Sequence, residues 1–199
     1  MGSPTHYFSP DPATPSRPQT VRLDLPDVSF ALRTDAGVFS GARVDPGTKV
    51  LLAEAPAPPP AGDLLDLGCG YGPIALTLAA RSPGATVWAV DVNERARALT
   101  AANAEAAGLA NVRVAAPDEV PADVRFAAIW SNPPVRVGKA ALHHLLTTWL
   151  GRLAADGVAL LVVQKHLGAD SLQRWLVEQG WTAARRSSRQ AYRVLEVRP

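Results

Sequence analysis

The sequence predicts an α/β fold, a doubly wound, Rossmann-like seven-stranded sheet with an N-terminal β-hairpin extension. From Gly62 onward, short apolar segments alternate with segments of helical periodicity. This alternation is typical of a parallel sheet covered by helices on both faces. One apolar segment, Asp63–Leu67, runs into a glycine-rich turn and then a helix. In doubly wound sheets such a turn lies at the ligand-binding edge.

The length of 199 residues suits one large domain with a short appendage. Residues 1–20 contain five prolines and little that can build a core, so we expect an extended arm there. His6-Tyr7-Phe8-Ser9 would anchor this arm to the body, with stacking on a base as the alternative. Residues 21–199 would form the folded domain, with a hairpin and helix extension over 21–60 and the core over 61–199.

The composition excludes several classes of protein. No apolar run approaches the roughly 20 residues of a membrane span, and the sequence begins without a basic-then-apolar signal pattern. We therefore expect a cytoplasmic protein without membrane contact. The single cysteine, Cys69, excludes an intramolecular disulfide and a cysteine-based zinc site, and the four histidines form no metal-binding pattern. We expect a monomer without a bound metal.

The extension begins with two alternating segments, Val21–Leu25 and Val28–Leu32, which predict a β-hairpin. After a loop, Asp45 can cap a helix with Pro46 at its first position. That helix should end near Ala55, because four prolines follow within the next five residues.

The core should alternate strands and helices. We expect strands over Asp63–Leu67, Thr86–Val90, Val112–Ala115, Phe126–Trp130 and Val158–Val163. We expect helices over about Pro73–Ala80, Glu94–Ala107, Lys139–Leu153 and Asp170–Gln179, and a closing antiparallel pair over Trp181–Arg185 and Tyr192–Val197. The strand Val158–Val163 is apolar on both faces, so it should lie centrally. Asn103 falls on the inner stripe of its helix and should be a hydrogen-bonded core residue.

Glycines and acids gather where the first two core strands end. Gly68, Gly70 and Gly72 let the backbone approach a ligand, and the following helix directs free N–H groups to the same place. Asp91 ends the second strand, where an acid can accept hydrogen bonds from both hydroxyls of a ribose. This pattern also fits an NAD enzyme. Asp66 favours S-adenosylmethionine instead, because an acid there can hold the ammonium of a methionine moiety but would repel a pyrophosphate.

A second motif, Asn132-Pro133-Pro134, follows the strand Phe126–Trp130. The exocyclic amine of a purine is a poor nucleophile, because its lone pair is delocalised into the ring. The side-chain oxygen of Asn132 and a backbone carbonyl near Pro133 can each accept one N–H of such an amine and direct its lone pair at a methyl group. An isolated Asn-Pro-Pro is usually a plain turn. After a glycine-turn sheet, however, it predicts an amino-group methyltransferase that uses S-adenosylmethionine.

Together these motifs resemble the class I methyltransferase fold, and specifically the small-domain family that methylates guanine N2 of 16S ribosomal RNA. The resemblance covers nearly the whole chain. It includes His6–Ser9, Asp35–Ser40, Leu65–Gly72, Asp91–Asn93, Ser131–Arg136, Gln164-Lys165 and Tyr192. The best-known members carry a second, degenerate methyltransferase-like domain ahead of this one, and this sequence resembles the single-domain form.

The resemblance implies a role for each motif. The catalytic residues would be Asn132, Pro133 and Pro134, which hold the target amine. The donor would be bound by Phe39, Ser40, Asp66, Gly68, Cys69, Gly70, Gly72, Asp91, Val92, Asp118 and Asn132. Phe39 and Ser40 would lie near the methionine end of the donor. Asp118 would lie near the adenine amino group, with a solvated surface position as the alternative.

The charge distribution points to a nucleic-acid partner. Net charge is only +2, yet residues 164–199 hold seven Lys or Arg against three Asp or Glu. Such a surface suits ribosomal RNA or the small ribosomal subunit, with plain solvation as the alternative. Arg185 and Arg186 belong to this basic segment, and Arg136 and Lys139 follow the Asn-Pro-Pro turn. We expect these four residues to contact RNA phosphate.

Other functions remain open at this point. The target amine can instead be adenine N6, a protein glutamine or a small molecule. Val135 stands where many adenine and glutamine methyltransferases carry an aromatic residue, which disfavours those two. A catalytically idle methyltransferase fold acting as an RNA-binding assembly factor is another class, but it would need neither Asp91 nor Asn132. An NAD dehydrogenase is the most distant alternative.

Overall fold

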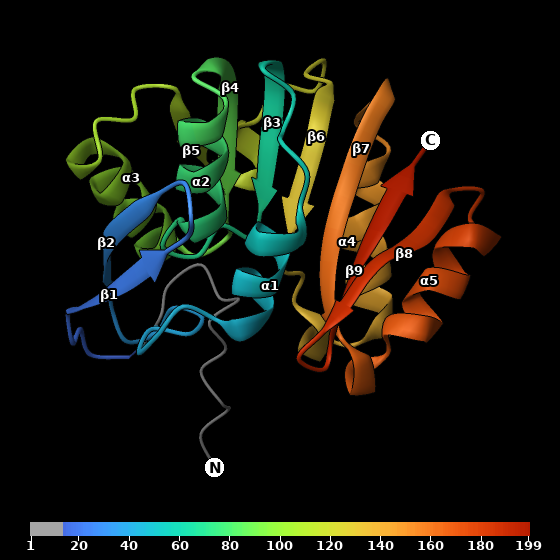
Figure 1. The fold of residues 1–199 in the computed structure, drawn as a ribbon, viewed down its shortest axis with the longest axis horizontal. Helices are drawn as coiled ribbons and strands as arrows, with labels where there is room; N and C mark the ends of the chain where they lie inside the picture. The colour runs from blue at the N-terminus through green and yellow to red at the C-terminus, as the bar shows by residue number, and fades with distance from the viewer. Residues whose placement is uncertain (1–13) are drawn as a thin grey trace.

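The computed structural model describes residues 14–199 (Figure 1). Most of the arm expected over residues 1–20, including the aromatic anchor His6–Ser9, lies outside the described residues. The hydroxyl of Ser16 donates to Asp35 Oδ2 at 2.6 Å, so the start of the described chain is tied to the loop after the hairpin. Among residues 14–199, no helix has the length and apolar composition that a membrane span requires.

A seven-stranded sheet forms the centre of the protein, as predicted (Figure 1). Its strands are β3 (Ala61–Leu67), β4 (Gly84–Val90), β5 (Val112–Ala115), β6 (Phe126–Ser131), β7 (Leu153–Gln164), β8 (Thr182–Arg189) and β9 (Tyr192–Arg198). They lie in the order β5-β4-β3-β6-β7-β9-β8. The first five are parallel, and β9 and β8 complete the sheet in antiparallel pairs. The strand order reverses between β4 and β6 on either side of β3, which is where such sheets bind ligands.

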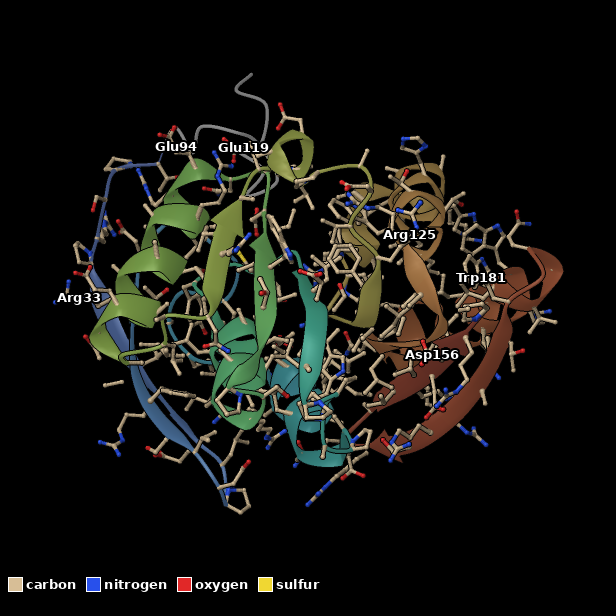
Figure 2. The ribbon with its side chains drawn as sticks, turned by 90° about the horizontal axis from the view of Figure 1, so that it is seen from above. Arg33, Glu94, Glu119, Arg125, Asp156 and Trp181 are labelled. Atoms are coloured by element: carbon tan, nitrogen blue, oxygen red, sulfur yellow. The ribbon has the colours of Figure 1, made fainter. Side chains whose placement is uncertain are left out.

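Helices cover both faces of this sheet, and side chains fill the two layers between (Figure 2). The helices are α1 (Pro46–Glu54), α2 (Pro73–Arg81), α3 (Glu94–Ala106), α4 (Lys139–Leu150) and α5 (Ala169–Glu178). The first three pack on one face around buried residues such as Leu51 and Leu76. The last two pack on the other face around Leu146 and Leu176. Strand β7 is buried on both faces, which confirms its predicted central place.

The hairpin of the extension, β1 (Gln19–Asp24) and β2 (Ser29–Thr34), forms a separate two-stranded sheet beside α3. Asn103 of α3 accepts the backbone N–H of Arg33 at 2.7 Å and donates to its carbonyl at 2.9 Å. It also donates to the carbonyl of Tyr71 at 2.8 Å. The expectation of a satisfied core asparagine is confirmed, and its bonds attach the hairpin to the core.

Three predicted boundaries were wrong. Strand β7 begins at Leu153, five residues before the predicted start. Helix α4 ends at Leu150 instead of Leu153, because Gly151 follows and Leu153 already pairs with Phe126 as the first residue of β7. Leu153 lies at a helical spacing from the buried residues of α4, but it belongs to strand β7 and is buried there. The antiparallel strand β8 reaches Arg189, four residues beyond the predicted end.

Candidate active site

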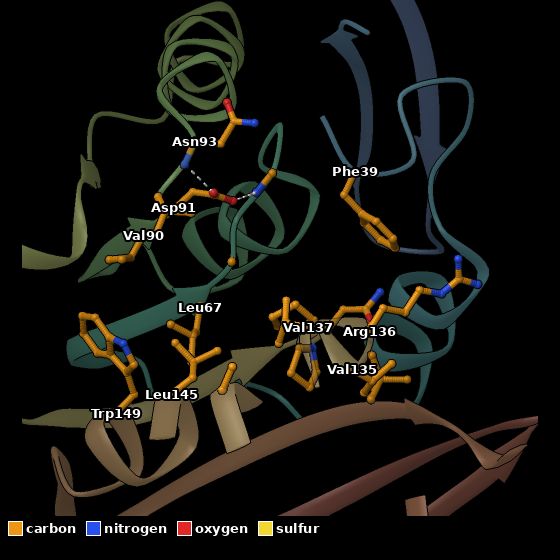
Figure 3. Close-up of a pocket in the computed structure, with 18 of the residues that line it drawn as sticks. Phe39, Leu67, Val90, Asp91, Asn93, Val135, Arg136, Val137, Leu145 and Trp149 are labelled. Atoms are coloured by element: carbon orange, nitrogen blue, oxygen red, sulfur yellow. Dashed lines mark hydrogen bonds between the residues drawn. The ribbon is translucent and has the colours of Figure 1, made fainter. Parts of the chain in front are cut away.

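A cavity of about 600 Å³ opens at the carboxyl ends of the parallel strands (Figure 3). Segments that follow β3, β4, β5, β6 and β7 all contribute to its wall, as does the loop before α1. These contributions include Gly68 and Gly70, Asp91 and Val92, Pro117, Asn132 to Val137, Leu167, and Val38 with Phe39. The two motifs found in the sequence therefore line one cavity.

The glycine turn forms one wall. Gly68 and Gly70 have φ values of 78° and 57°, and a Cβ at either would meet nothing within 4 Å. Both positions therefore leave open space on the cavity side. Gly72 differs, since a Cβ there would lie 2.8 Å from the Leu76 side chain and 3.0 Å from that of Thr100. Its role is to let α2 pack closely against α3.

Asp91 lies at the end of β4 with its carboxylate fixed in place. Oδ2 accepts the backbone N–H of Gly70 at 2.9 Å, and Oδ1 accepts that of Asn93 at 2.9 Å (Figure 3). Burial raises the pKa of Asp91, and the two backbone donors act against this rise. Each oxygen keeps a lone pair beyond its backbone bond, so the carboxylate can accept hydrogen bonds from a ligand in the cavity.

Asp66 lies beneath the glycine turn and is fully buried. Its Oδ2 accepts the backbone N–H of Ala75 in α2 at 2.8 Å, and its Oδ1 has no hydrogen-bond partner among the described residues. Burial, together with the nearby charge of Asp91, raises the pKa of Asp66 to about 8. Asp66 is not among the residues that line the cavity. Its predicted contact with the donor stays a prediction.

The loop before α1 forms the facing wall. Phe39 reaches into the cavity opposite Asp91 (Figure 3). Phe39 and Val92 are 38% and 40% exposed, so both offer apolar surface to a ligand. Ser40 and Cys69 line a separate small space of about 20 Å³, which Gly68, Gly70 and Asn132 also line. The loop is held by Asn93, whose Nδ2 donates to the carbonyl of Gly37 at 3.0 Å.

Asn132 sits between the glycine turn and α1. Its Nδ2 donates to Asp45 Oδ1 at 2.8 Å and to Thr48 Oγ1 at 3.1 Å. Both N–H bonds of the amide are therefore used within the protein, and Oδ1 is left as an acceptor for a ligand. The carbonyl of Pro133 already accepts the N–H of Val135 at 2.8 Å. It has one further lone pair for a target amine.

The remaining predicted site residues lie around the rim or away from it. Asp118 is exposed in a short turn, and its neighbour Pro117 lines the cavity instead. Arg136 lines the mouth and is exposed, and Lys139 is exposed at the start of α4. Both flank the Asn-Pro-Pro turn.

The two arginines of β8 that were predicted to contact RNA, Arg185 and Arg186, differ in their surroundings. Arg185 is exposed. Arg186 instead forms an ion pair with Glu196 at 2.9 Å and donates to the carbonyl of Glu54 at 3.2 Å. Part of the basic C-terminal surface is therefore neutralised within the protein.

Sequence reasoning missed several residues of the site. Asp45 was interpreted only as a helix cap, yet it lines the cavity and contacts Asn132. Trp149 lies within a predicted helix and was given no role in the site, and it lines the cavity. Tyr192 was named as part of the resemblance but given no role, and it lines the cavity from β9. No local pattern identifies these residues, because each reaches the site through the packing of a distant element.

The comparisons with known proteins agree with this geometry. The model of the methyltransferase small domain family matches residues 29–196. A Bacillus subtilis (strain 168) protein, the uncharacterized YbxB, is 40% identical over 169 residues, which is 83% of this chain and 84% of that protein. Ribosomal RNA small subunit methyltransferase C of Aeromonas hydrophila is 39% identical over 147 residues, or 71% of this chain and 42% of that enzyme.

Among solved structures, the Thermus thermophilus 16S rRNA N2 G1207 methyltransferase, in complex with AdoMet and guanosine, superposes with a TM-score of 0.74 at 25% identity. The match covers 92% of this chain and 51% of that one. The chain thus spans about half the length of these RNA methyltransferases or less. With a family match over residues 29–196 and a class I methyltransferase sheet, the chain belongs to the methyltransferase small domain family, whose members use S-adenosylmethionine.

Proposed function

We propose that this protein transfers a methyl group from S-adenosylmethionine to the N2 amine of guanine in small-subunit ribosomal RNA. The observation that carries the proposal is that Asn132 shares one cavity with the glycine turn and Asp91, with its amide oxygen left as an acceptor. The glycine turn and Asp91 suit a donor, and Asn132 suits an amine.

The described residues fit the donor. The open space beside Gly68 and Gly70 admits a ligand close to the backbone, and Asp91 would accept both ribose hydroxyls. Val92 would pack against the adenine ring, and Phe39 and Ser40 would lie near the methionine end. We also propose Asp66 for the ammonium group and Asp118 for the adenine amine, as the family resemblance implies.

The chemistry requires mainly positioning. S-adenosylmethionine supplies a methyl group on a sulfonium, which is electrophilic without activation. Asn132 Oδ1 and the Pro133 carbonyl would each accept one N–H of the target amine, which favours a tetrahedral nitrogen with its lone pair directed at the methyl carbon. The same two acceptors would bind the amine more tightly as its nitrogen gains positive charge, so they stabilise the transition state more than the bound substrate.

The names of two relatives support the choice of guanine N2. The Aeromonas hydrophila relative is named as a small-subunit ribosomal RNA methyltransferase, and the Thermus thermophilus enzyme is named for N2 of G1207 in 16S rRNA. Within this chain, Val135 provides no aromatic surface to stack on an adenine or a glutamine amide. Arg136 and Lys139 would contact RNA phosphates beside the target base.

The test is methyl transfer from labelled S-adenosylmethionine to small ribosomal subunits and to protein-free 16S rRNA, followed by mass spectrometry of the nucleosides. We expect N2-methylguanosine as the labelled product. Labelled N6-methyladenosine would transfer the assignment to adenine. Absence of label in all RNA, with donor binding intact, would favour a different amine substrate or an assembly factor without activity.

A further inference from the structure

We propose that Asp45 is a positioning residue for Asn132. This inference rests on the function proposed above, in which Asn132 holds the target amine. Asp45 belongs to the extension ahead of the core, 87 positions before Asn132 in the sequence. The extension would then take part in the chemistry, in addition to covering the sheet.

Two acceptors hold the Asn132 amide. Asp45 Oδ1 accepts one N–H at 2.8 Å, and the buried hydroxyl of Thr48 accepts the other at 3.1 Å. An asparagine amide has a nearly symmetrical shape, so only such bonds decide which end is the oxygen. A reversed amide would direct its oxygen at the Asp45 carboxylate and its N–H groups at the N–H groups of the target amine. Both contacts are repulsive, so Asp45 selects the orientation that accepts from an amine. The Thr48 hydroxyl can donate or accept, and it accepts the second N–H in this orientation.

Asp45 is itself fixed by the helix that it caps. The same Oδ1 accepts the backbone N–H of Thr48 at 3.1 Å, and Pro46 starts α1. A Cβ at the buried Gly47 would lie 2.7 Å from the ring of Tyr192, so the first turn of α1 lies directly on β9. The orientation of the catalytic amide therefore depends on the packing of α1 against the sheet.

A direct chemical role for Asp45 is the competing interpretation. Asp45 lines the cavity, and its Oδ2 has no hydrogen-bond partner within residues 14–199. This oxygen can in principle accept the proton that the methylated amine releases. The two roles predict different variants to be active, because positioning needs one acceptor atom and proton acceptance needs a carboxylate.

Two substitutions of Asp45 separate these roles. Asp45→Asn retains one carbonyl oxygen, and that single atom makes both bonds of Oδ1. Asp45→Ser retains a good helix cap, but its hydroxyl is too short to reach Asn132. Asp156→Ser changes an exposed acid of strand β7 (Figure 2) and serves as the matched control.

The measurement is the single-turnover rate of methyl transfer to the RNA substrate at saturating donor, with donor affinity measured in parallel. We expect Asp45→Ser to lower the rate by roughly 10- to 100-fold, because a small misplacement of a reacting group has this effect. Asp45→Asn should recover the rate to within about fivefold of wild type, since a neutral acceptor is weaker than a charged one. Donor affinity should change by less than about threefold in both, because the donor contacts remain in place. Asp156→Ser should react at the wild-type rate.

Two results would overturn this role. If Asp45→Asn reacts as slowly as Asp45→Ser, the carboxylate itself is required. If Asp45→Ser reacts at the wild-type rate, the contact with Asn132 has no catalytic consequence.

A readout without substrate separates this inference from the proposed function. In ¹⁵N-labelled protein, the side-chain amide of Asn132 should exchange its protons slowly in wild type and Asp45→Asn, and faster in Asp45→Ser. If wild type methylates no RNA, the proposed function fails, and the exchange rates still decide whether Asp45 orients Asn132. Equal exchange in all three proteins would refute the orienting bond.

Discussion

Replacing Asp91 should weaken donor binding by an amount that follows from its geometry. Both carboxylate oxygens accept a backbone N–H at 2.9 Å, from Gly70 and from Asn93, so neither can rotate away from the cavity wall. Each oxygen would accept one ribose hydroxyl of the donor. A hydrogen bond to a charged group contributes about 1.5–3 kcal/mol. Loss of only one such bond in Asp91→Ala corresponds to at least about a tenfold increase in Kd.

The isosteric change Asp91→Asn should restore little of this affinity. An asparagine has one oxygen, so its NH₂ group must face the N–H of either Gly70 or Asn93, and two donors repel. Calorimetry with S-adenosylhomocysteine measures both variants, and Asp123→Ala, an exposed acid in the loop before β6, is the control. Wild-type affinity in a folded Asp91→Ala protein would refute the role of this acid. Wild-type affinity in Asp91→Asn would refute the account of how its oxygens are oriented.

Three further predictions follow from charge. Burial raises the pKa of Asp91, so donor affinity should fall on acidification at a pH above the usual aspartate range near 4, and Asp91→Ala should lack this dependence. Folded Asp66 keeps its proton up to about pH 8, whereas the unfolded chain ionises near 3.9. Stability should therefore fall between pH 5 and 8, and thermal unfolding of Asp66→Asn should show a smaller fall. Replacing Arg136 and Lys139 together by Glu should lower the slope of log RNA affinity against log salt concentration by about one to two. Arg125→Glu is the control. Equal slopes in the two variants would show that Arg136 and Lys139 are solvated surface residues without RNA contact.

Much of the fold was predictable because its signals are local. A parallel strand buried on both faces is a continuous apolar run, as β7 shows. This pattern can be recognised in the sequence without knowing which strands lie beside it. The edge that holds the site was also predictable, since the carboxyl ends of parallel strands meet there. Gly68, Gly70, Asp91 and Asn132 all line the cavity that this reasoning placed at that edge.

The contacts that complete the site were not predictable, because they join distant segments. Asp45 reaches Asn132 only after α1 packs on the sheet, and Arg186 is paired with Glu196 only after β8 and β9 align. The end of α4 shows a different limit. Leu153 fits a helical spacing, yet α4 ends before Gly151, and Leu153 is the first residue of strand β7.

The central claim is that Asn132 accepts the target amine, and one measurement tests it most directly. Asn132→Ala removes the side-chain acceptor and leaves the glycine turn and Asp91 in place. The rate of single-turnover methyl transfer to the small subunit or its RNA should fall by a factor of roughly 10²–10³, because one preorganised polar contact is lost. The affinity for S-adenosylhomocysteine should stay at the wild-type value. Transfer by Asn132→Ala at the wild-type rate would contradict the amino-methyltransferase mechanism.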